Sequence, residues 1–166
     1  MAGFHLLSPY FLVSLKELYS KQRECSSDIG RRKNRQEVDL AQFCLDRGTI
    51  LHELNHVVGF EHEHVRPDRD QYIEVIWDNF TSEEFKKEMY IVKDRKRWSV
   101  FNESYDLYSL MHYGPYAYGN GKITIRARDS YFQNIIGQGK GFSAKDIRKI
   151  RKMYNCLPDR PQDVIY

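Results

Sequence analysis

The sequence predicts an α+β fold in a single domain, with a central helix and little sheet. Four segments carry helical spacing or helix start signals, at residues 9–22, at residues 47–59, after Ser82 and from Ser143 onward. The strand-like segments, residues 38–40 and 123–125, are short runs with β-branched residues. A chain of 166 residues is long enough to bury one hydrophobic core. One domain with more helix than strand is therefore expected.

The first helix is predicted over residues 9–22. Ser8 provides an N-cap, and Pro9 occupies the first helical position, where a backbone N–H is not needed. The apolar residues that follow are spaced to share one face of a helix. They are Phe11, Leu12, Leu15, Leu18 and Tyr19.

Two later helices are predicted from their start signals. Ser82 is expected to cap a short helix, and Ser143 is expected to begin the last helix of the chain. The short helix is expected to carry Phe85 and Met89, and the last helix is expected to face inward with Ile147, Ile150 and Tyr154.

Composition and charge exclude several classes of protein. Apolar residues make up 41% of the chain and charged residues 30%, which is ordinary for a globular domain. A net charge of +3 is too small to predict binding to nucleic acid or to a membrane surface. No apolar run approaches the roughly 18 residues of a membrane span. The basic residues between Arg31 and Arg35 are interpreted as a solvated loop.

The most informative segment holds three histidines and one carboxylate within eleven residues, from His52 to His62. Its spacing, H-E-x-x-H-x-x-G-x-x-H, resembles the metzincin form of the zinc-protease signature. Positions i and i+4 share one face of a helix, so His52 and His56 can reach the same ion. Glu53 lies on the same turn, and Gly59 lets the chain leave the helix so that His62 returns toward the other two histidines.

This helix also has a more ordinary interpretation. A single H-x-x-x-H pair on an amphipathic helix is common and by itself is weak evidence for zinc. The glycine and the third histidine at the expected spacing favour a metal site. Three protein ligands with one open position are typical of catalytic zinc. The remaining apolar residues are interpreted as core contacts: Leu51, Leu54, Val57, Val58 and Phe60.

Three further motifs carry a resemblance to a known family. The run from His62 to Asp70 resembles the H-E-x-x-R-x-D-R-D segment of astacins. Ser109-Leu110-Met111-His112-Tyr113-Gly114 resembles the Met-turn of that family, and the segment at 133–138 also matches. The resemblance extends from Cys25 to Cys156. It implies a metzincin, zincin-like fold with an active-site helix, a C-terminal subdomain that contains the Met-turn, and a reduced N-terminal sheet.

The resemblance also implies roles for individual residues. One Zn²⁺ per chain would be bound by His52, His56 and His62, with Glu53 as general base and then general acid. Met111 would form an apolar floor beneath the metal. Tyr113 would be a fifth ligand that can move away and stabilise the developing negative charge. His112 is interpreted as a structural residue and His64 as a solvated one.

Substrate and compartment follow from the same resemblance. It implies a zinc-dependent metalloendopeptidase that acts on proteins or peptides, with Arg128 binding an acidic side chain just after the cleaved bond. No nucleic acid partner is expected. Astacins are secreted, and their pattern pairs Cys25 with Cys44 in a disulfide, while the family partner of Cys156 lies in a segment without a counterpart here. Residues 1–20 make a poor signal peptide.

The departures from the family pattern divide the chain into three regions. Residues 1–24 are expected to form an atypical, helical N-terminal segment, residues 25–156 a partial catalytic domain, and residues 157–166 a tail. In astacins a mature N-terminus meets the glutamate after the third histidine, here Glu63, and no matching segment is seen. The alternative expectation is therefore a truncated, catalytically impaired fragment that acts at most as a zinc-binding or interaction module.

Overall fold

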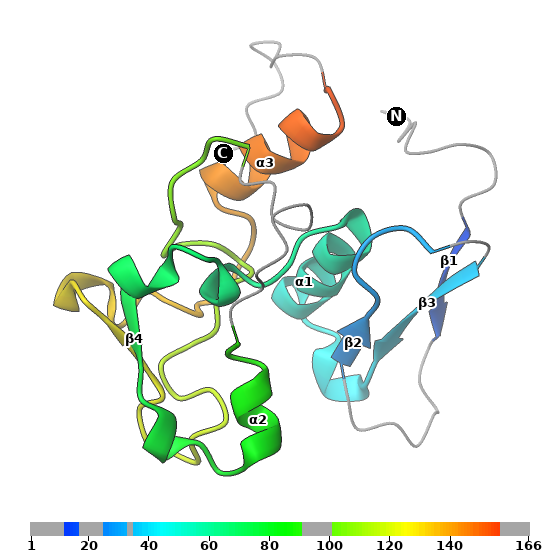
Figure 1. Cartoon of the computed structure of the whole chain (residues 1–166). Helices are drawn as coiled ribbons and strands as arrows, with labels where there is room; N and C mark the ends of the chain where they lie inside the picture. Colours follow the sequence, from blue (N-terminus) through cyan, green and yellow to red (C-terminus); the bar gives the residue numbers. More distant parts are fainter. Residues whose placement is uncertain (1–11, 17–24, 33–34, 91–100, 157–166) are drawn as a thin grey trace. The chain divides into compact units, whose positions relative to one another are not determined.

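The structure, a computed structural model, describes residues 12–16, 25–32, 35–90 and 101–156 (Figure 1). The described residues fall into two compact units, and the division between them lies between Glu61 and His62, with Gly139–Gly141 belonging to the first unit. The predicted tail at 157–166 and most of the predicted segment 1–24 lie outside the described residues. The strands and helices are β1 Leu12–Lys16, β2 Cys25–Ser27, β3 Arg35–Leu40, α1 Arg47–Val58, β4 Ile73–Val75, α2 Glu83–Lys87, β5 Ile125–Ala127 and α3 Ala144–Met153. Short 3-10 helices lie at Gln42–Cys44, Glu63–Val65, Arg69–Gln71, Trp77–Asn79 and Ser130–Phe132.

The first unit is a three-stranded sheet with α1 packed beside it (Figure 1). The strand order is β1-β3-β2, with β1 parallel and β2 antiparallel to the central strand β3. The predicted strand at residues 38–40 is thus confirmed as part of β3. Apolar side chains from β3, the following turn and α1 form the core of this unit. They are Val38, Leu40, Ala41, Cys44 and Val57.

A disulfide joins Cys25 in β2 to Cys44 in the turn after β3, with the two Cα atoms 6.0 Å apart. This confirms the predicted pairing. A closed loop of this length restricts the unfolded chain and stabilises the fold by about 3 kcal/mol. The bond therefore fastens the edge strand β2 to the residues that lead into α1.

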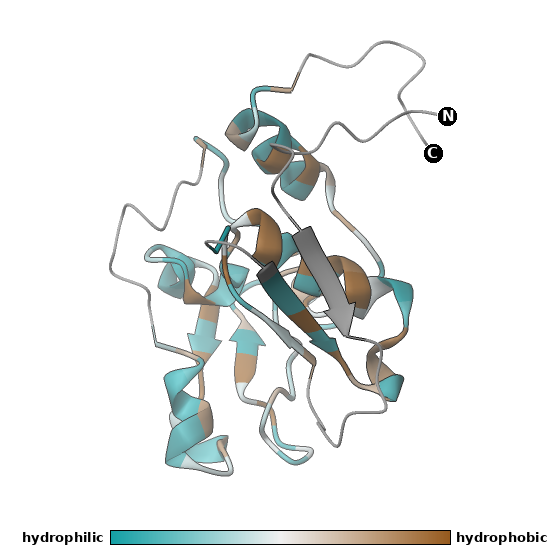
Figure 2. Ribbon diagram, turned by 90° about the vertical axis from the view of Figure 1, so that its right-hand side faces the viewer, coloured by the Kyte–Doolittle hydropathy of each residue, from teal (hydrophilic) through white to brown (hydrophobic). Residues whose placement is uncertain are grey.

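The second unit contains the antiparallel pair β4 and β5 together with α2 and α3. Its core is made by residues from β4, β5 and the loops around them, namely Ile73, Phe80, Met89, Ile125 and Ile136. The predicted cap of α2 is confirmed, since the hydroxyl of Ser82 accepts a hydrogen bond from the N–H of Phe85. Figure 2 shows α2 largely in the colours of polar residues, and its Phe85 is exposed.

The predicted helix at residues 9–22 is wrong where the structure tests it, because residues 12–16 form the strand β1. This strand pairs in parallel register with β3, from Leu12 opposite Arg35 to Lys16 opposite Asp39. The pairing provides hydrogen-bond partners for both backbones. A local apolar pattern carries no information about a partner strand more than twenty residues away. Here the tertiary pairing with β3 overrides the local preference for a helix.

Two smaller predictions are also corrected. The strand expected at residues 123–125 is shifted, and β5 begins at Ile125 because it pairs there with Val75. The last helix does begin after Ser143, but its buried residues are Asp146 and Lys149. Ile147 is 43% exposed, so the apolar spacing did not identify the inward face. Polar contacts determine which face of α3 is buried.

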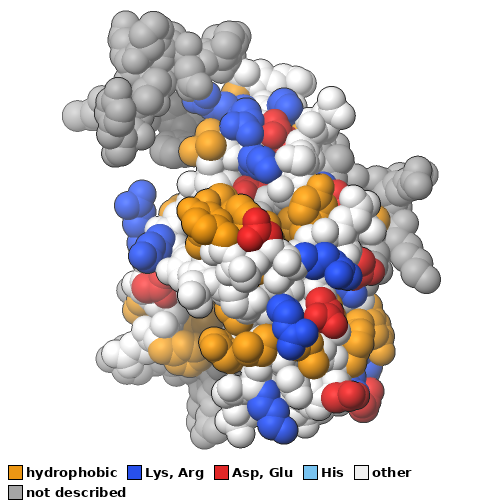
Figure 3. Space-filling model, turned by 90° about the vertical axis from the view of Figure 1, so that its left-hand side faces the viewer, with side chains coloured by type: hydrophobic (Ala, Val, Ile, Leu, Met, Phe, Trp, Pro, Cys, Tyr) orange, Lys and Arg blue, Asp and Glu red, His pale blue; other side chains and the backbone are white. Residues whose placement is uncertain are grey.

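Charges on the surface are mixed in sign. The face in Figure 3 shows Lys and Arg side chains lying beside Asp and Glu side chains. An exposed pair between Arg126 and Glu74, 2.9 Å apart, is one example. Among the described residues, no helix has the length and apolar character that crossing a bilayer requires.

Candidate metal centre

Helix α1 presents His52, Glu53 and His56 on adjacent positions of its surface. The helix starts at Asp46, whose carboxylate accepts a hydrogen bond of 3.0 Å from the N–H of Thr49. The rings of His52 and His56 lie edge to face, with their centroids 4.8 Å apart. This is the geometry that the spacing of four residues predicts for two side chains on one helical face.

The helix ends at Gly59, as the sequence predicts. Gly59 has a φ of 122°, a conformation that favours glycine, and its N–H bonds to the carbonyl oxygens of Asn55 and His56. The N–H of Gly30 donates to the same His56 carbonyl at 2.8 Å. The chain therefore turns sharply out of α1 and reaches His62 three residues later.

Among the residues that the structure describes, His52, His56 and His62 form a group suited to a metal ion, with ligand atoms within 4.8 Å of one another. Three imidazole nitrogens match the donors that zinc accepts, and they leave one coordination position open. Burial, together with the neighbouring His52, lowers the pKa of His56 to about 4. At neutral pH the ring is therefore uncharged, which is the form that binds metals.

The tautomer of His56 also suits a metal ligand. Its Nδ1 lies 2.7 Å from the carbonyl oxygen of Phe60. A carbonyl can only accept, so Nδ1 carries the proton and the lone pair lies on Nε2. Metal-binding histidines commonly donate their other nitrogen to a carbonyl in this way. The residues present therefore fit a zinc ion.

Glu53 is buried and its carboxylate is oriented by a serine in β2. The hydroxyl of Ser27 lies 2.9 Å from Oε2 of Glu53 and 2.8 Å from its backbone oxygen. Burial raises the pKa of Glu53, and the hydrogen bond from Ser27 opposes part of that rise. Sequence reasoning missed Ser27 because it precedes Glu53 by 26 positions and belongs to no recognised pattern.

The predicted Met-turn places Met111 in a buried position in the second unit. The carbonyl oxygen of Met111 accepts a hydrogen bond of 2.9 Å from the N–H of Glu63, the residue after His62. Met111 itself donates its N–H to the hydroxyl of Ser109. The turn and the His62 segment are therefore joined through their backbones.

Tyr113 lies close to His62, with ring centroids 4.5 Å apart. Its ring stacks on His64 at 4.0 Å, and its hydroxyl lies 3.2 Å from the hydroxyl of Tyr118. These contacts are compatible with the two positions that the resemblance implies for Tyr113. Its role as a ligand stays a prediction.

The prediction that His64 is solvated is wrong, because the residue is fully buried. Its Nδ1 accepts a hydrogen bond from the N–H of Tyr113, and the aromatic ring of Tyr113 covers it. His112 is buried, as expected for a structural residue. Its ring nitrogens contact the hydroxyl of Tyr105 at 2.8 Å and the carbonyl oxygen of Tyr113 at 2.7 Å, and burial lowers its pKa to about 4.

Arg128, the predicted substrate-binding residue, is exposed and follows β5. Its Nε donates to the carbonyl oxygen of Asp70 at 2.6 Å, which fixes the guanidinium near the end of the His62–Asp70 motif. Binding of an acidic substrate side chain by Arg128 stays a prediction.

A sequence profile of the Astacin peptidase family matches residues 15–155. The chain belongs to the astacin family. This astacin is 42% identical over 141 residues to zinc metalloproteinase nas-8 of Steinernema carpocapsae, covering 84% of this chain and 33% of that protein. It is 44% identical over 136 residues to zinc metalloproteinase nas-4 of Caenorhabditis elegans, covering 80% and 41% of the two chains.

The fold of this astacin is also similar to that of a solved structure. The high choriolytic enzyme 1 of the medaka fish Oryzias latipes, a hatching enzyme zinc-protease, superposes with a TM-score of 0.79 at 32% identity. The match covers 92% of this chain and 72% of that one. The α+β metzincin fold predicted from the sequence is therefore confirmed. The chain spans 33% and 41% of the length of the two curated nematode relatives named above.

Proposed function

We propose that this chain is a zinc-dependent metalloendopeptidase in which His52, His56 and His62 bind one zinc ion. The observation that carries the proposal is the approach of their ligand atoms to within 4.8 Å of one another. Zinc bound there would lower the pKa of a bound water to about 7 and polarise the carbonyl of the substrate. The names of the relatives, zinc metalloproteinases, support this assignment.

Glu53 acts as the proton carrier in this proposal. It follows His52 on α1, and Ser27 holds its Oε2 by a hydrogen bond of 2.9 Å. Its carboxylate takes a proton from the attacking water and later gives it to the leaving amine. Because Ser27 orients one oxygen, the other oxygen is the one that exchanges the proton.

Tyr113 and Met111 have supporting roles. The hydroxyl of Tyr113 donates to the oxygen that becomes negative when water attacks the peptide carbonyl. In the present geometry that hydroxyl lies next to Tyr118, at 3.2 Å, so a rotation of the side chain brings it into use. Met111 provides an apolar contact below the metal ligands.

Protein or peptide substrates are proposed, with a preference for an acidic residue just after the cleaved bond through Arg128. Secretion is proposed as well, because the disulfide between Cys25 and Cys44 is typical of an oxidising compartment.

Substitution of Glu53 by Gln tests the proposal directly. The purified wild-type chain should hydrolyse a fluorescent casein substrate, and Glu53→Gln should lower kcat by about 10²–10⁴-fold. Zinc measured by atomic absorption should stay at one ion per chain, because glutamine leaves the three histidines in place. Glu74→Gln, a change at an exposed ion pair, is the matched control and should keep full activity.

Each result separates the candidates. Equal activity of wild type and Glu53→Gln would remove Glu53 from the mechanism. A wild-type chain that binds zinc but cleaves no substrate would favour the alternative, a catalytically impaired zinc-binding module.

A further inference from the structure

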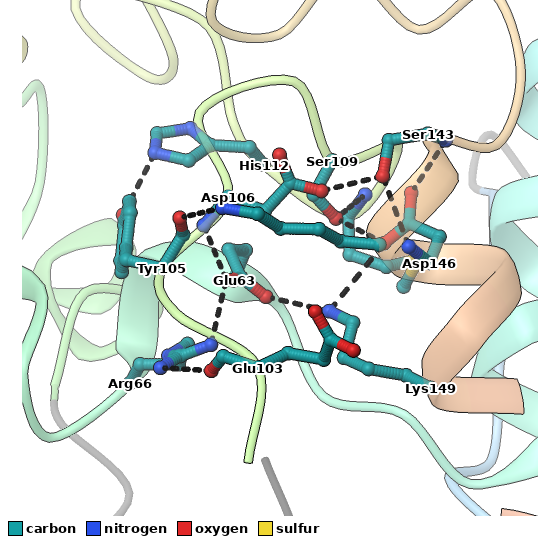
Figure 4. A network of polar contacts seen from close by, with 12 residues as sticks. Glu63, Arg66, Glu103, Tyr105, Asp106, Ser109, His112, Ser143, Asp146 and Lys149 are labelled. Carbon is teal, nitrogen blue, oxygen red and sulfur yellow. Dashed lines mark hydrogen bonds and ion pairs between the residues drawn. The ribbon is translucent and has the colours of Figure 1, made fainter. Parts of the chain in front are cut away.

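Lys149 is a buried cation on α3 that lies between two buried carboxylates (Figure 4). Its ammonium nitrogen is 2.9 Å from Oε2 of Glu63 and 3.4 Å from Oδ1 of Asp146, while its side chain is only 7% exposed. Burial lowers the pKa of Lys149, but attraction by Glu63 and Asp146 outweighs that effect, so its pKa lies above the ordinary value. The ammonium is therefore charged at neutral pH.

The first carboxylate belongs to the segment that carries the third histidine. Glu63 follows His62 directly, and its N–H is bonded to the carbonyl oxygen of Met111. Its Oε1 accepts from the guanidinium of Arg66 at 3.0 Å and from the N–H of Asp106 at 2.8 Å. Both oxygens of Glu63 are thus used, and Lys149 accounts for the contact to Oε2.

The second carboxylate holds the Met-turn. Oδ1 of Asp146 accepts from the hydroxyl of Ser109 at 2.7 Å, and Oδ2 accepts from the N–H of Leu110 at 2.9 Å. Figure 4 shows Asp146 and Lys149 projecting from α3 toward Ser109 and Glu63. One turn of α3 therefore contacts two segments of the second unit, the His62–Glu63 segment and the Met-turn.

Arg66 cannot replace Lys149 in this arrangement. Arg66 is only three residues after Glu63, and its guanidinium is shared with Asp68 through two hydrogen bonds, of 2.9 and 2.8 Å. Its longer-range contacts, to the carbonyl oxygen of Glu103 at 3.4 Å and to the ring of Tyr105, lie before the Met-turn and do not reach α3. Lys149 comes from a helix 86 positions later, so it is the cation that connects the His62–Glu63 segment to α3.

We propose that Lys149 is a positioning residue for the metal centre: its ammonium, held between Glu63 and Asp146, fixes the orientation of the His62–Glu63 segment against the Met-turn. This inference rests on the proposed function. Residues that orient metal ligands from outside the coordination sphere typically change metal affinity by about 10–100-fold when they are replaced. Lys149 would act on the metal only indirectly, through Glu63 and then His62. We therefore expect a change in metal affinity in the lower part of this range.

The test compares Lys149→Met with Lys149→Arg in the full chain. Zinc affinity is measured by competition with a chromophoric chelator, and the absorption spectrum of the cobalt-substituted protein reports ligand geometry. Lys149→Met should weaken zinc binding by about 10-fold and alter the cobalt spectrum. Lys149→Arg, which keeps the positive charge, should bind zinc within about threefold of wild type and restore the spectrum.

Lys152→Met is the matched control, because it makes the same change one turn later on the same helix and breaks an exposed ion pair of 2.8 Å with Glu103. It should leave zinc affinity and the cobalt spectrum unchanged. The proposal would be overturned if the Lys149→Met protein bound zinc as tightly as the Lys152→Met protein, even if Lys149→Met were less stable. Equal losses of affinity in Lys149→Met and folded Lys149→Arg would overturn it as well.

A second variant covers the case in which Lys149→Met does not fold. The double substitution Glu63→Gln and Lys149→Met removes both charges of the pair, so neither remains buried alone. The folded double variant should also bind zinc about 10-fold more weakly than wild type, and wild-type affinity in it would refute the role of the pair. If wild type itself binds no zinc, the proposed function fails together with the inference. If wild type binds zinc and cleaves casein, the proposed function holds, and the comparison of the Lys149 variants then tests only the positioning role of Lys149.

Discussion

The carboxylate of Glu53 depends on a hydroxyl from another element of the first unit. Ser27 lies in β2 and contacts both the side chain and the backbone oxygen of Glu53. A serine hydroxyl has one proton to donate, so it anchors the carboxylate without neutralising it. The orientation of the proposed base is therefore set by the sheet as well as by α1.

Substitution of Ser27 by Ala should lower kcat by about 10-fold, which corresponds to about 1.4 kcal/mol, near the lower end of what a hydrogen bond to a charged group contributes. Zinc content should not change, because both of these hydrogen bonds go to Glu53 and neither involves one of the three histidines. Steady-state kinetics on casein peptides measure the effect. Ser26→Ala, at an exposed neighbouring position, is the control, and equal kcat values for the two variants would contradict the role of Ser27.

Gly137 is a second position where one residue has a defined structural task. Its φ is 73°, and a Cβ built there would lie 2.2 Å from the Cα of Gly114, the residue after Tyr113. Gly137→Ala should therefore lower the free energy of unfolding by about 1–3 kcal/mol or more, as overpacking does. Urea denaturation provides the measurement.

Gly121→Ala separates steric conflict from backbone strain at Gly137. Gly121 has a comparable φ of 85°, but nothing lies within 4 Å of the position of its Cβ. The Gly121→Ala protein should therefore lose less free energy of unfolding than the Gly137→Ala protein. Equal destabilisation of the two variants would show that contact with Gly114 is not the cause.

At the scale of elements, Glu103 links the loop before the Met-turn to α3. Its carboxylate accepts hydrogen bonds from Arg148 and Lys152, and these bonds lower its pKa to about 2. The ordinary pKa of the group is 4.5. The stabilisation by Glu103 is therefore complete above about pH 4.5 and is lost as the pH falls toward 2.

Comparison of wild type with Glu103→Gln should reveal this dependence. The difference in free energy of unfolding between the two proteins should be largest at pH 5 and should shrink at pH 4 and again at pH 3. Urea denaturation of the metal-free proteins measures it, because histidine protonation then affects both proteins equally. A difference that stays constant between pH 5 and 3 would contradict the assignment.

The elements differ in how well the sequence predicted them, and the difference has a physical cause. Helix α1 was predicted closely because its histidine spacing and Gly59 are both local signals. Strand β1 was missed because its partner, β3, lies far along the chain. The buried face of α3 was missed because a pattern method expects apolar residues inside, whereas Asp146 and Lys149 are buried through ion pairs.

The candidate site divides in the same manner. The three histidines and Glu53 form one short motif with a known spacing, so they could be identified without a structure. Ser27, which contacts Glu53, lies 26 positions before it, and Lys149, which contacts Glu63, lies 86 positions after it. Hydrogen bonds over such separations leave no periodic trace in a single sequence.

At the scale of the whole molecule, zinc should stabilise the folded chain, because the three histidines come together only in the native state. Free zinc at 100 times its dissociation constant should raise the free energy of unfolding by about 2.7 kcal/mol. Urea denaturation with and without buffered zinc measures the change. Calcium at the same concentration is the control, since it prefers oxygen ligands and should have no effect. Equal stabilisation by both ions would argue against a nitrogen-donor site.

The distance in sequence between Glu63 and Lys149 affects how the protein is made. The ribosome adds the 86 residues that separate them at about 5–20 residues per second, so roughly 4–17 s pass between their syntheses. During that interval the nascent histidine motif exists without its distant ammonium. With the role proposed for Lys149, the metal-binding segment reaches its final form only after α3 has left the ribosome, and a chain that stops before α3 would carry an intact histidine motif without the contact that holds it.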